Sequence, residues 1–310
     1  MAAEVVVVDH SEDEAEVEAL RAVKAERLIA QPNRGYAAGV NRGVAAARGE
    51  VLIVANPDVE LREGALEPLL AALGEYAVVS PQLWLGPLRY PPTEPHRPTA
   101  ELARLVVARW PRFRKPLVVR EFRRAISVWS STRPVRQLFL SGALLAFRSD
   151  TFQGLGPWDE DYFLYYEETD WLLRAHRRGF ACALVPTAHA EHGWGASANP
   201  SQHGRTVLLS RRRYYRKNFP FWGYLVSSCP VPAPCFPRKT VPKSLPVPGK
   251  VWWFVSPVPV GVPAFGIEAG SEFPQREIRN ALSPERHPRT WLVGAMTKQG
   301  RLEGLWRWDV

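Results

Sequence analysis

The stretch Glu50-Val-Leu-Ile-Val-Ala-Asn-Pro-Asp58 is a continuous apolar run that ends in a polar turn. Its β-branched centre predicts a strand buried on both faces, as in a parallel sheet. An aspartate just past such a strand can bind a hard cation such as Mg²⁺ or Mn²⁺, and Asn56 offers a neutral oxygen ligand. A simple Asn-Pro-Asp turn is the alternative interpretation.

Similar strands and helices alternate on both sides of this stretch. Strands are expected at 4–8, 27–29, 50–55 and 77–80, and helices at 14–25, after 33–43, and at 63–73. This alternation predicts an α/β fold with a doubly wound, mainly parallel sheet flanked by helices. Asp9 follows the first strand, where open α/β sheets place ligand contacts. A cap for the helix at 14–25 is an equally good reading of Asp9.

Composition limits the classes of protein to consider. The 310 residues carry a net charge of +9 and a pI near 9.7, which indicates an anionic partner such as nucleic acid, anionic lipid or a phosphorylated substrate. Three cysteines form no disulfide framework or zinc motif, a usage that suits a reducing cytoplasm. The sequence shows neither a secretory leader nor an apolar run long enough to span a membrane.

Residues 86–136 form a basic insertion in the alternating pattern. From residue 101 to its end it holds ten basic residues and two acids, Glu101 and Glu121. Apolar and aromatic residues interleave with the arginines, which suits an interfacial helix on an anionic membrane. A loop of solvated arginines fits equally well. Nucleic-acid binding has no stacking motif or recognised fold to support it.

An acidic and aromatic stretch occupies residues 156–171. Its sixteen positions hold six acidic and six aromatic residues, and such a cluster repels itself unless a cation or a proton stabilises it. A catalytic site with a general base beside a metal or charged substrate is one interpretation, and a solvated acidic loop is the other. A helix is expected to follow, with Asp170 and Arg174 paired four residues apart.

Several short motifs together resemble family 2 glycosyltransferases of the GT-A (Rossmann-like) fold, particularly the bacterial rhamnosyltransferase-like branch. The resemblance covers about residues 4–218 and rests on the order of seven motifs. They are Val-Val-Asp-His-Ser at 7–11, the glycine-rich segment at 33–43, Asn-Pro-Asp-Val at 56–59, Ser-Gly-Ala at 141–143, Trp-Asp-Glu at 158–160, Tyr-Tyr-Glu-Glu-Thr-Asp-Trp at 165–171 and His-Gly-Trp-Gly-Ala-Ser at 192–197.

The resemblance implies an inverting transfer from a nucleotide-diphospho-sugar to an acceptor hydroxyl, with Glu168 as the catalytic base. It implies that a divalent cation, Mg²⁺ or Mn²⁺, is held by Asp58 and His192. Acceptor contacts are expected from Asp159, Glu160 and Gly142. The nucleotide-sugar contacts that it implies are Asp9, Asn33, Gly35, Asn41, Asn56 and Asp58. Asn56, in place of a first aspartate, favours a deoxysugar donor such as a nucleotide-linked rhamnose.

The resemblance also implies a setting in the cell. The expected acceptor is a glycan or polyprenyl-linked sugar used in cell-surface polysaccharide synthesis. We expect a cytoplasmic protein, peripheral on the inner face of the membrane, with no nucleic-acid partner.

The expected domain is 1–219, with the insertion at about 86–136, and a proline-rich, poorly ordered tail at 220–310. The tail holds fourteen of the 29 prolines and shows no clear periodicity. The family normally begins with one more strand, ending in a Thr-x-Asn-like segment, and its lack here predicts a gap or open edge in the sheet. Two alternatives are a catalytically impaired remnant of the fold and a basic nucleic-acid-binding protein.

Overall fold

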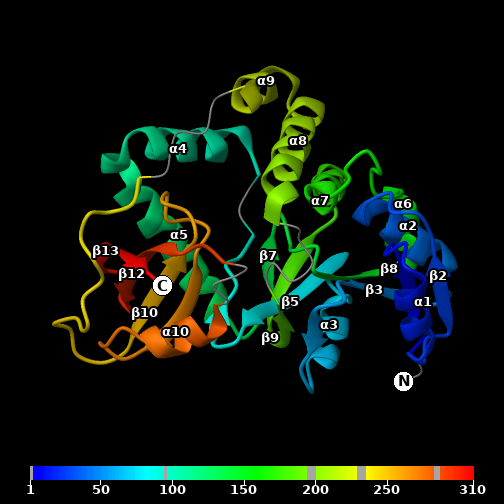
Figure 1. Ribbon diagram of the computed structural model, residues 1–310, viewed down its shortest axis with the longest axis horizontal. Coiled ribbons are helices and arrows are strands. Elements are labelled where there is room, and N and C mark those ends of the chain that lie inside the picture. The colour runs from blue at the N-terminus through cyan, green and yellow to red at the C-terminus, as the bar shows by residue number, and fades with distance from the viewer. Residues whose placement is uncertain (1–2, 94–95, 194–199, 229–234, 283–286) are drawn as a thin grey trace.

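The computed structural model describes residues 3–93, 96–193, 200–228, 235–282 and 287–310 (Figure 1). At one end of the molecule lies a small parallel sheet of β1 (Val6–Asp9) and β2 (Arg27–Ala30), joined by α1 (Glu14–Arg21). The side chain of Asp13 caps α1 by accepting a hydrogen bond from the N–H of Ala15 at 2.8 Å. The helix cap is therefore Asp13 and not Asp9.

The main sheet is mixed. Its strands run in the order β13-β12-β10-β11-β6-β5-β8-β3, and β9 (Cys182–His192) adds to β5 (Val78–Leu85) while also pairing with β4 (Val59–Leu61) and β7 (Val135–Gln137). Within this sheet the described part of the chain has one parallel pair, β5 with β9, and the other pairs are antiparallel. The α/β class is confirmed, but the expectation of a mainly parallel sheet is wrong.

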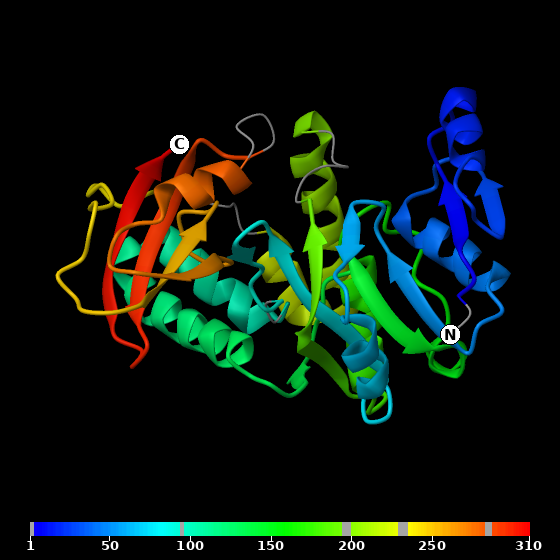
Figure 2. The same ribbon diagram turned by 90° about the horizontal axis from the view of Figure 1, so that it is seen from below.

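Helices on both faces explain this error. In β8 (Leu144–Arg148), Leu145 and Phe147 pack with α7 (Glu167–Arg177), whereas Leu144 and Ala146 pack with α3 (Leu66–Ala72). An antiparallel strand covered on both faces is as continuously apolar as a parallel one, so strand direction leaves no mark on the pattern. Figure 2 shows the helices on the two sides of the sheet.

No strand of the small sheet is hydrogen-bonded to a strand of the main sheet among the described residues. Among the described strands, β1 pairs only with β2, and β3 (Val51–Ala55) pairs only with β8. Each of these two strands therefore keeps one edge without a hydrogen-bonded neighbour strand. Helix α2 (Tyr36–Ala46), which follows β2, packs against β1 and α7.

The segment after residue 219 is not an irregular tail. It begins with α9 (Pro220–Ser228), which follows α8 (Pro200–Asn218), and continues into β10 (Val251–Ser256), β11 (Phe265–Ala269), α10 (Gln275–Ala281), β12 (Thr290–Thr297) and β13 (Leu302–Asp309). No proline lies within these four strands or α10. Apart from Pro220, which begins α9, the described prolines lie in the connections, so the average composition hid four ordered strands. The division of the chain at residue 219 stays a prediction.

The basic insertion packs on these C-terminal strands. It forms β6 (Leu88–Arg89), α4 (Pro98–Arg109), η1 (Pro111–Phe113) and α5 (Arg114–Trp129). Phe122 of α5 stacks on Phe254 of β10 with ring centroids 3.7 Å apart, and Trp129 packs on Trp252. The apolar side of α5 is thus buried in protein, and the interfacial-helix interpretation is wrong for α5. The described chain has no helix long and apolar enough to cross a membrane.

Candidate active site

The site centres on the start of α7. Tyr165 and Tyr166, which precede this helix, have left-handed backbones with φ of +70° and +71°. Such a conformation costs about 1–3 kcal/mol per non-glycine residue and concentrates at functional sites. The turn starts α7 at Glu167, so that Glu167 and Glu168 lie in its first turn, where the helix dipole favours negative charge.

These two adjacent carboxyl groups differ in environment. Glu167 is only 3% exposed, and its Oε2 has no hydrogen-bond partner among the described residues. Burial and the neighbouring Glu168 charge raise the pKa of Glu167 well above its ordinary value. Glu168 is half-buried and accepts a hydrogen bond from Thr169 Oγ1 at 3.0 Å, and burial raises its pKa as well. Glu168 therefore combines access to solvent with increased basicity.

Two residues from other elements surround Glu168. Gly142 lies so close that a Cβ atom there would be 3.0 Å from Cγ of Glu168. The hydroxyl of Tyr36, at the start of α2, donates a hydrogen bond to the carbonyl of Gly142 at 2.9 Å. Burial, followed by the charges of Glu167, Glu168 and Asp58, raises the pKa of Tyr36. Tyr36 therefore remains a neutral hydrogen-bond donor near the carboxylates of Glu167, Glu168 and Asp58.

A carboxylate and an imidazole form the other side of the site. Asp58 follows β3, and His192 ends β9, paired across the ladder with Val59. His192 Nε2 lies 3.5 Å from Asp58 Oδ1. That Oδ1 and His192 Nδ1 are both buried without a hydrogen-bond partner in the described part of the protein. Burial lowers the pKa of His192 despite the nearby Asp58, so the ring stays neutral and can donate a lone pair.

Asn56 links this pair to Gly142. Its backbone N–H donates to the carbonyl of Ala143 at 2.9 Å. The ends of β3 and β9 and the start of β8 thus bring Asp58, His192 and Gly142 to one edge of the main sheet.

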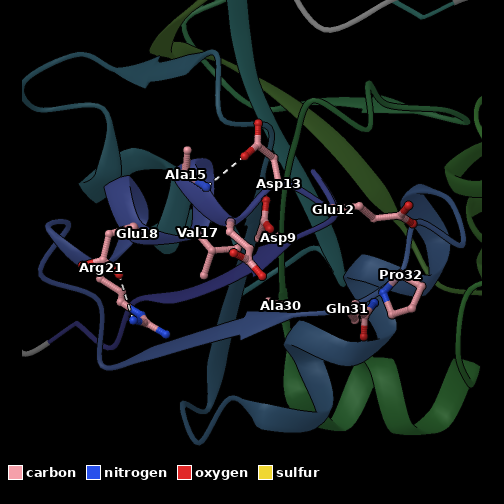
Figure 3. A pocket seen from close by; sticks show the side chains of 11 residues that line it. Asp9, Glu12, Asp13, Ala15, Val17, Glu18, Arg21, Ala30, Gln31 and Pro32 are labelled. Atoms are coloured by element: carbon pink, nitrogen blue, oxygen red, sulfur yellow. Dashed lines mark hydrogen bonds and ion pairs between the residues drawn. The ribbon is translucent and has the colours of Figure 1, made fainter.

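Asp9 lies apart from this group, in a cavity of about 810 Å³ beside α1 (Figure 3). Its carboxylate accepts hydrogen bonds from Ser11 N–H at 3.1 Å and Ser11 Oγ at 2.9 Å. Gln31 and Pro32 line the same cavity, which therefore borders the loop that leads to α2. Acidic side chains dominate the lining, with Arg21 as its basic member.

The loop that begins α2 is tied to the acidic stretch. Asn33 Oδ1 accepts from the N–H of Gly35 at 3.1 Å, and the N–H of Tyr36 donates to the carbonyl of Phe163 at 2.9 Å. Gly35 has φ of +94°, and a Cβ there would lie 2.3 Å from the Phe163 carbonyl oxygen. Glycine at 35 is thus required by contact with protein backbone.

Asn41 uses its side chain to hold the start of the acidic stretch. Its Oδ1 accepts from Trp158 N–H at 2.9 Å, and its Nδ2 donates to Trp158 O at 2.9 Å and Glu160 Oε1 at 3.0 Å. Arg34 adds an ion pair to Glu160 at 3.1 Å. Asn41 therefore positions Glu160, one of the predicted acceptor contacts.

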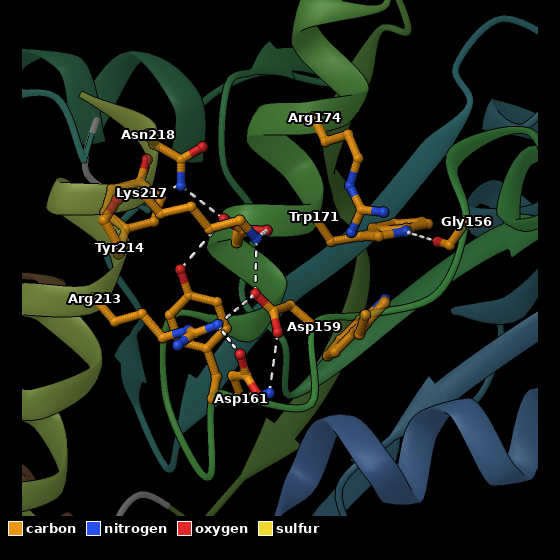
Figure 4. Close-up of polar contacts among 12 residues, drawn as sticks. Gly156, Asp159, Asp161, Trp171, Arg174, Arg213, Tyr214, Lys217 and Asn218 are labelled. Atoms are coloured by element: carbon orange, nitrogen blue, oxygen red, sulfur yellow. Dashed lines mark hydrogen bonds and ion pairs between the residues drawn. The ribbon is translucent and has the colours of Figure 1, made fainter. Parts of the chain in front are cut away.

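Helix α8 neutralises the remaining acids (Figure 4). Lys217 Nζ lies 2.8 Å from both Asp159 Oδ2 and Asp170 Oδ2, and Arg213 pairs with Asp159 and Asp161. Burial raises the pKa of Asp159, but the contacts with Lys217 and Arg213 outweigh it and leave the pKa lowered. The acidic stretch is thus held against a basic helix.

The expected pairing of Asp170 with Arg174 is wrong. Asp170 accepts from Lys217 and from Asn218 Nδ2 at 2.6 Å, whereas Arg174 donates to the carbonyls of Leu155 and Pro157. Asp170 therefore pairs with residues of α8 and not with Arg174, four residues along its own helix.

With this geometry in place, the chain can be compared with known proteins. Residues 2–130 match the model of glycosyl transferase family 2. The matched region holds the family 2 segments around Asp9, Gly35 and Asp58, and it ends before α7 and β9, which carry Glu168 and His192.

Two curated relatives are similar over a longer stretch. Both are N-acetylglucosaminyl-diphospho-decaprenol L-rhamnosyltransferases of Mycobacterium tuberculosis, from strains CDC 1551 / Oshkosh and ATCC 25618 / H37Rv. Each is 31% identical to this chain over 210 residues, which cover 59% of it. The chain spans 65% of the length of these relatives, slightly under two thirds.

Two solved structures show a weaker likeness. GalNAc-T7 with UDP, GalNAc and Mn²⁺ aligns at a TM-score of 0.44 and 17% identity, covering 71% of this chain and 46% of that one. The mannosyltransferase PcManGT from Pyrobaculum calidifontis, in complex with GDP-Man and Mn²⁺, aligns at 0.45 and 17%, covering 69% and 54%. At these scores neither supports an argument about this protein.

The structure adds three residues to the site predicted from the sequence. Tyr36 lies in the glycine-rich segment at 33–43, Glu167 lies in the acidic stretch, and Lys217 lies on α8, but the sequence singled out none of them as a site residue. The left-handed turn before α7 buries Glu167, and no local pattern signals this. The motifs at 194–197 lie outside the described residues.

Proposed function

We propose that this protein is an inverting glycosyltransferase of the GT-A fold. It moves a sugar, rhamnose in our proposal, from a nucleotide-diphospho-sugar to a glycan or polyprenyl-linked acceptor in cell-surface polysaccharide synthesis. The observation that carries the proposal is the gathering of two groups: Gly142 contacts Glu168 and Tyr36, and the Asp58–His192 pair is connected to them through the backbone hydrogen bond from Asn56 to Ala143. The match of residues 2–130 to the family 2 model and the likeness to two rhamnosyltransferases support it.

Glu168 acts as the base in this proposal. An inverting transfer needs a group that takes the acceptor proton while the acceptor oxygen attacks the anomeric carbon from the face opposite the leaving group. Glu168 is half-buried with a raised pKa, so its carboxylate holds a transferred proton more tightly than a solvated glutamate does. In this proposal Gly142, Asp159 and Glu160 contact the acceptor.

Asp58 and His192 fit a divalent cation. A buried carboxylate oxygen without a partner beside a neutral imidazole is a donor set suited to Mn²⁺ or Mg²⁺. The described residues contain no group of three or more metal-ligating side chains, so the donor's diphosphate and water would complete the coordination. When bound, the cation supplies charge stabilisation for the leaving diphosphate. Asp9, Asn33, Gly35, Asn41 and Asn56 shape the donor side of the site in this proposal.

A transfer assay tests this function. The purified chain is incubated with Mn²⁺, a nucleotide-linked rhamnose and N-acetylglucosaminyl-diphospho-polyprenol, and the glycolipid product is measured. Glu168→Gln is expected to lower kcat by about 10²–10⁴-fold because the carboxylate base is lost. Asp58→Asn is expected to remove the dependence on Mn²⁺. Glu63→Gln, an exposed control, should behave as the parent does.

The same assay separates transfer from the alternative of an impaired remnant. If the parent transfers no sugar and hydrolyses no donor, and Glu168→Gln behaves identically, the transferase proposal is wrong. We place the protein in the cytoplasm at the inner face of the membrane as part of this proposal, because its acceptor would be membrane-bound.

A further inference from the structure

Helix α9 presents large apolar side chains to solvent. Phe221, Trp222 and Leu225 are 76%, 54% and 50% exposed. Leu225 follows Trp222 by three residues and Phe221 by four, so it lies next to both on the helix surface. Large aromatic residues gathered on a surface mark contact with another molecule or a membrane far more often than isolated ones do.

A second apolar group lies where α4 meets η1. Val106, Trp110 and Phe113 are between 40% and 45% exposed. Arginines alternate with them, with the guanidinium of Arg109 5.6 Å from the Trp110 ring centroid and that of Arg112 4.8 Å from the Phe113 ring centroid. Helices α4 and α9 are in contact and lie along the same edge of the molecule (Figure 1). We call these six apolar residues with Arg109 and Arg112 the α4–α9 surface.

The two segments that contain the α4–α9 surface carry basic residues and no acidic ones. Neither 102–120 nor 192–267 contains an aspartate or glutamate. On α8, next to α9, the exposed residues Arg205, Leu209 and Arg212 follow one another at helical spacing. The α4–α9 surface therefore carries exposed apolar and aromatic side chains on two contacting helices, with basic side chains beside them and on the adjoining α8.

We propose that the α4–α9 surface docks this chain onto an anionic lipid bilayer. Tryptophan and phenylalanine enter the boundary between headgroups and acyl chains, and arginines beside them reach the lipid phosphates. A second copy of the chain is disfavoured as the occupant, because two such surfaces would bring like charges together. The inference rests on the surface and is independent of the proposed sugar transfer.

The docking elements differ from those that the sequence predicted. The apolar side of α5, in the middle of the basic segment, is buried against β10, so it cannot contact lipid. Only the end of α4 with η1 retains exposed apolar residues from that segment, and α9 supplies the rest. The membrane-facing surface is thus assembled from two segments more than 100 residues apart in the chain.

Vesicle cosedimentation tests this inference with the full chain. We expect binding to phosphatidylcholine vesicles that contain phosphatidylglycerol, weaker binding to phosphatidylcholine alone, and loss of binding as salt increases. The double variants Phe221→Ser/Trp222→Ser and Arg109→Glu/Arg112→Glu should each weaken binding at least about tenfold, since each basic residue near the surface accounts for about fivefold. Val23→Ser and Lys243→Glu are exposed controls and should bind as the parent does.

Unfolding midpoints and circular dichroism establish that each variant is folded, which is expected because the replaced side chains are exposed. Equal binding to both vesicle types, or parental binding by both double variants, would overturn the inference. A concentration-dependent dimer that dissociates in Phe221→Ser/Trp222→Ser would also overturn it, because the surface would then serve self-association.

Discussion

Glu168 packs against the backbone of Gly142, so that a Cβ atom at position 142 would lie 3.0 Å from Cγ and 3.2 Å from Cβ of Glu168. The same Gly142 accepts a hydrogen bond from Tyr36 through its carbonyl. One glycine therefore determines where the proposed base sits relative to α2. Its backbone conformation is open to any residue, so a larger side chain there would be opposed by its contact with Glu168.

We expect Gly142→Ala to displace the Glu168 side chain and to lower kcat of transfer by about ten- to a hundredfold, because a base misplaced by about 1 Å loses alignment with the acceptor. The donor binds elsewhere and should keep its affinity. Steady-state kinetics with both substrates measure these two effects separately. Gly270→Ala is the matched control, since nothing lies within 4 Å of a Cβ there. Parental kcat in Gly142→Ala would show that this contact does not position the base.

Glu167 predicts a specific dependence of stability on pH. Its pKa in the folded protein is raised above the ordinary 4.5, so the folded state holds the proton more tightly than the unfolded state. Its contribution to the free energy of unfolding is complete below the unfolded pKa and is lost as the pH rises through the folded pKa. We expect Glu167→Gln to be about 1–3 kcal/mol more stable than the parent at pH 7 and similar to it at pH 4.

Urea unfolding across this pH range measures the effect, with Glu63→Gln as the exposed control. A difference between parent and Glu167→Gln that stays constant from pH 4 to pH 7 would contradict a proton held at Glu167.

Lys217 predicts a loss of stability on removal. It lies 2.8 Å from Asp159 and Asp170, and Asp170 is 3% exposed. Lys217→Met leaves a buried carboxylate with fewer partners, which should cost about 1–3 kcal/mol, less than for a fully buried pair because Lys217 is partly exposed. The pKa of Asp159 is lowered in the folded protein. The contribution of Asp159 to the free energy of unfolding is therefore present above its unfolded pKa and is lost as the pH falls through its folded pKa.

The loss of stability caused by Lys217→Met should therefore be smaller at low pH. Thermal unfolding at several pH values checks this, and Arg212→Met, an exposed site on the same helix, is the control. If Lys217→Met and Arg212→Met lowered the stability equally at pH 7, the contacts of Lys217 with Asp159 and Asp170 would not stabilise the protein.

Asn41 predicts an effect of similar size by a different route. Asn41→Ala removes both bonds to the backbone of Trp158 and the one to Glu160. Leaving these polar groups without partners should destabilise the protein by about 2–4 kcal/mol. Urea unfolding measures the change, with the exposed Asn280→Ala as control. A loss under about 0.5 kcal/mol would mean that water replaces the asparagine without cost.

The local sequence identified much of the candidate site. Short-range patterns marked it: buried apolar runs that lead into Asp9 and Asp58, the glycine-rich start of α2, and the acidic stretch. Each of these lies at or next to one end of a strand or helix in the structure. Gly142 and Glu168, 26 residues apart, were singled out separately, but only the fold shows that they touch.

The sequence by itself determined which segments are strands and helices up to β5, apart from the short strand β4, and the chemical types at the site. The tertiary structure decided strand direction, because helices on both faces make parallel and antiparallel strands equally apolar. It also decided the ionic partner of Asp170 and the burial of Glu167, since both depend on contacts between α7 and distant segments. Four ordered strands after residue 250 escaped detection because the prolines between them dominate the composition, whereas tryptophan packing against α5 determines their order.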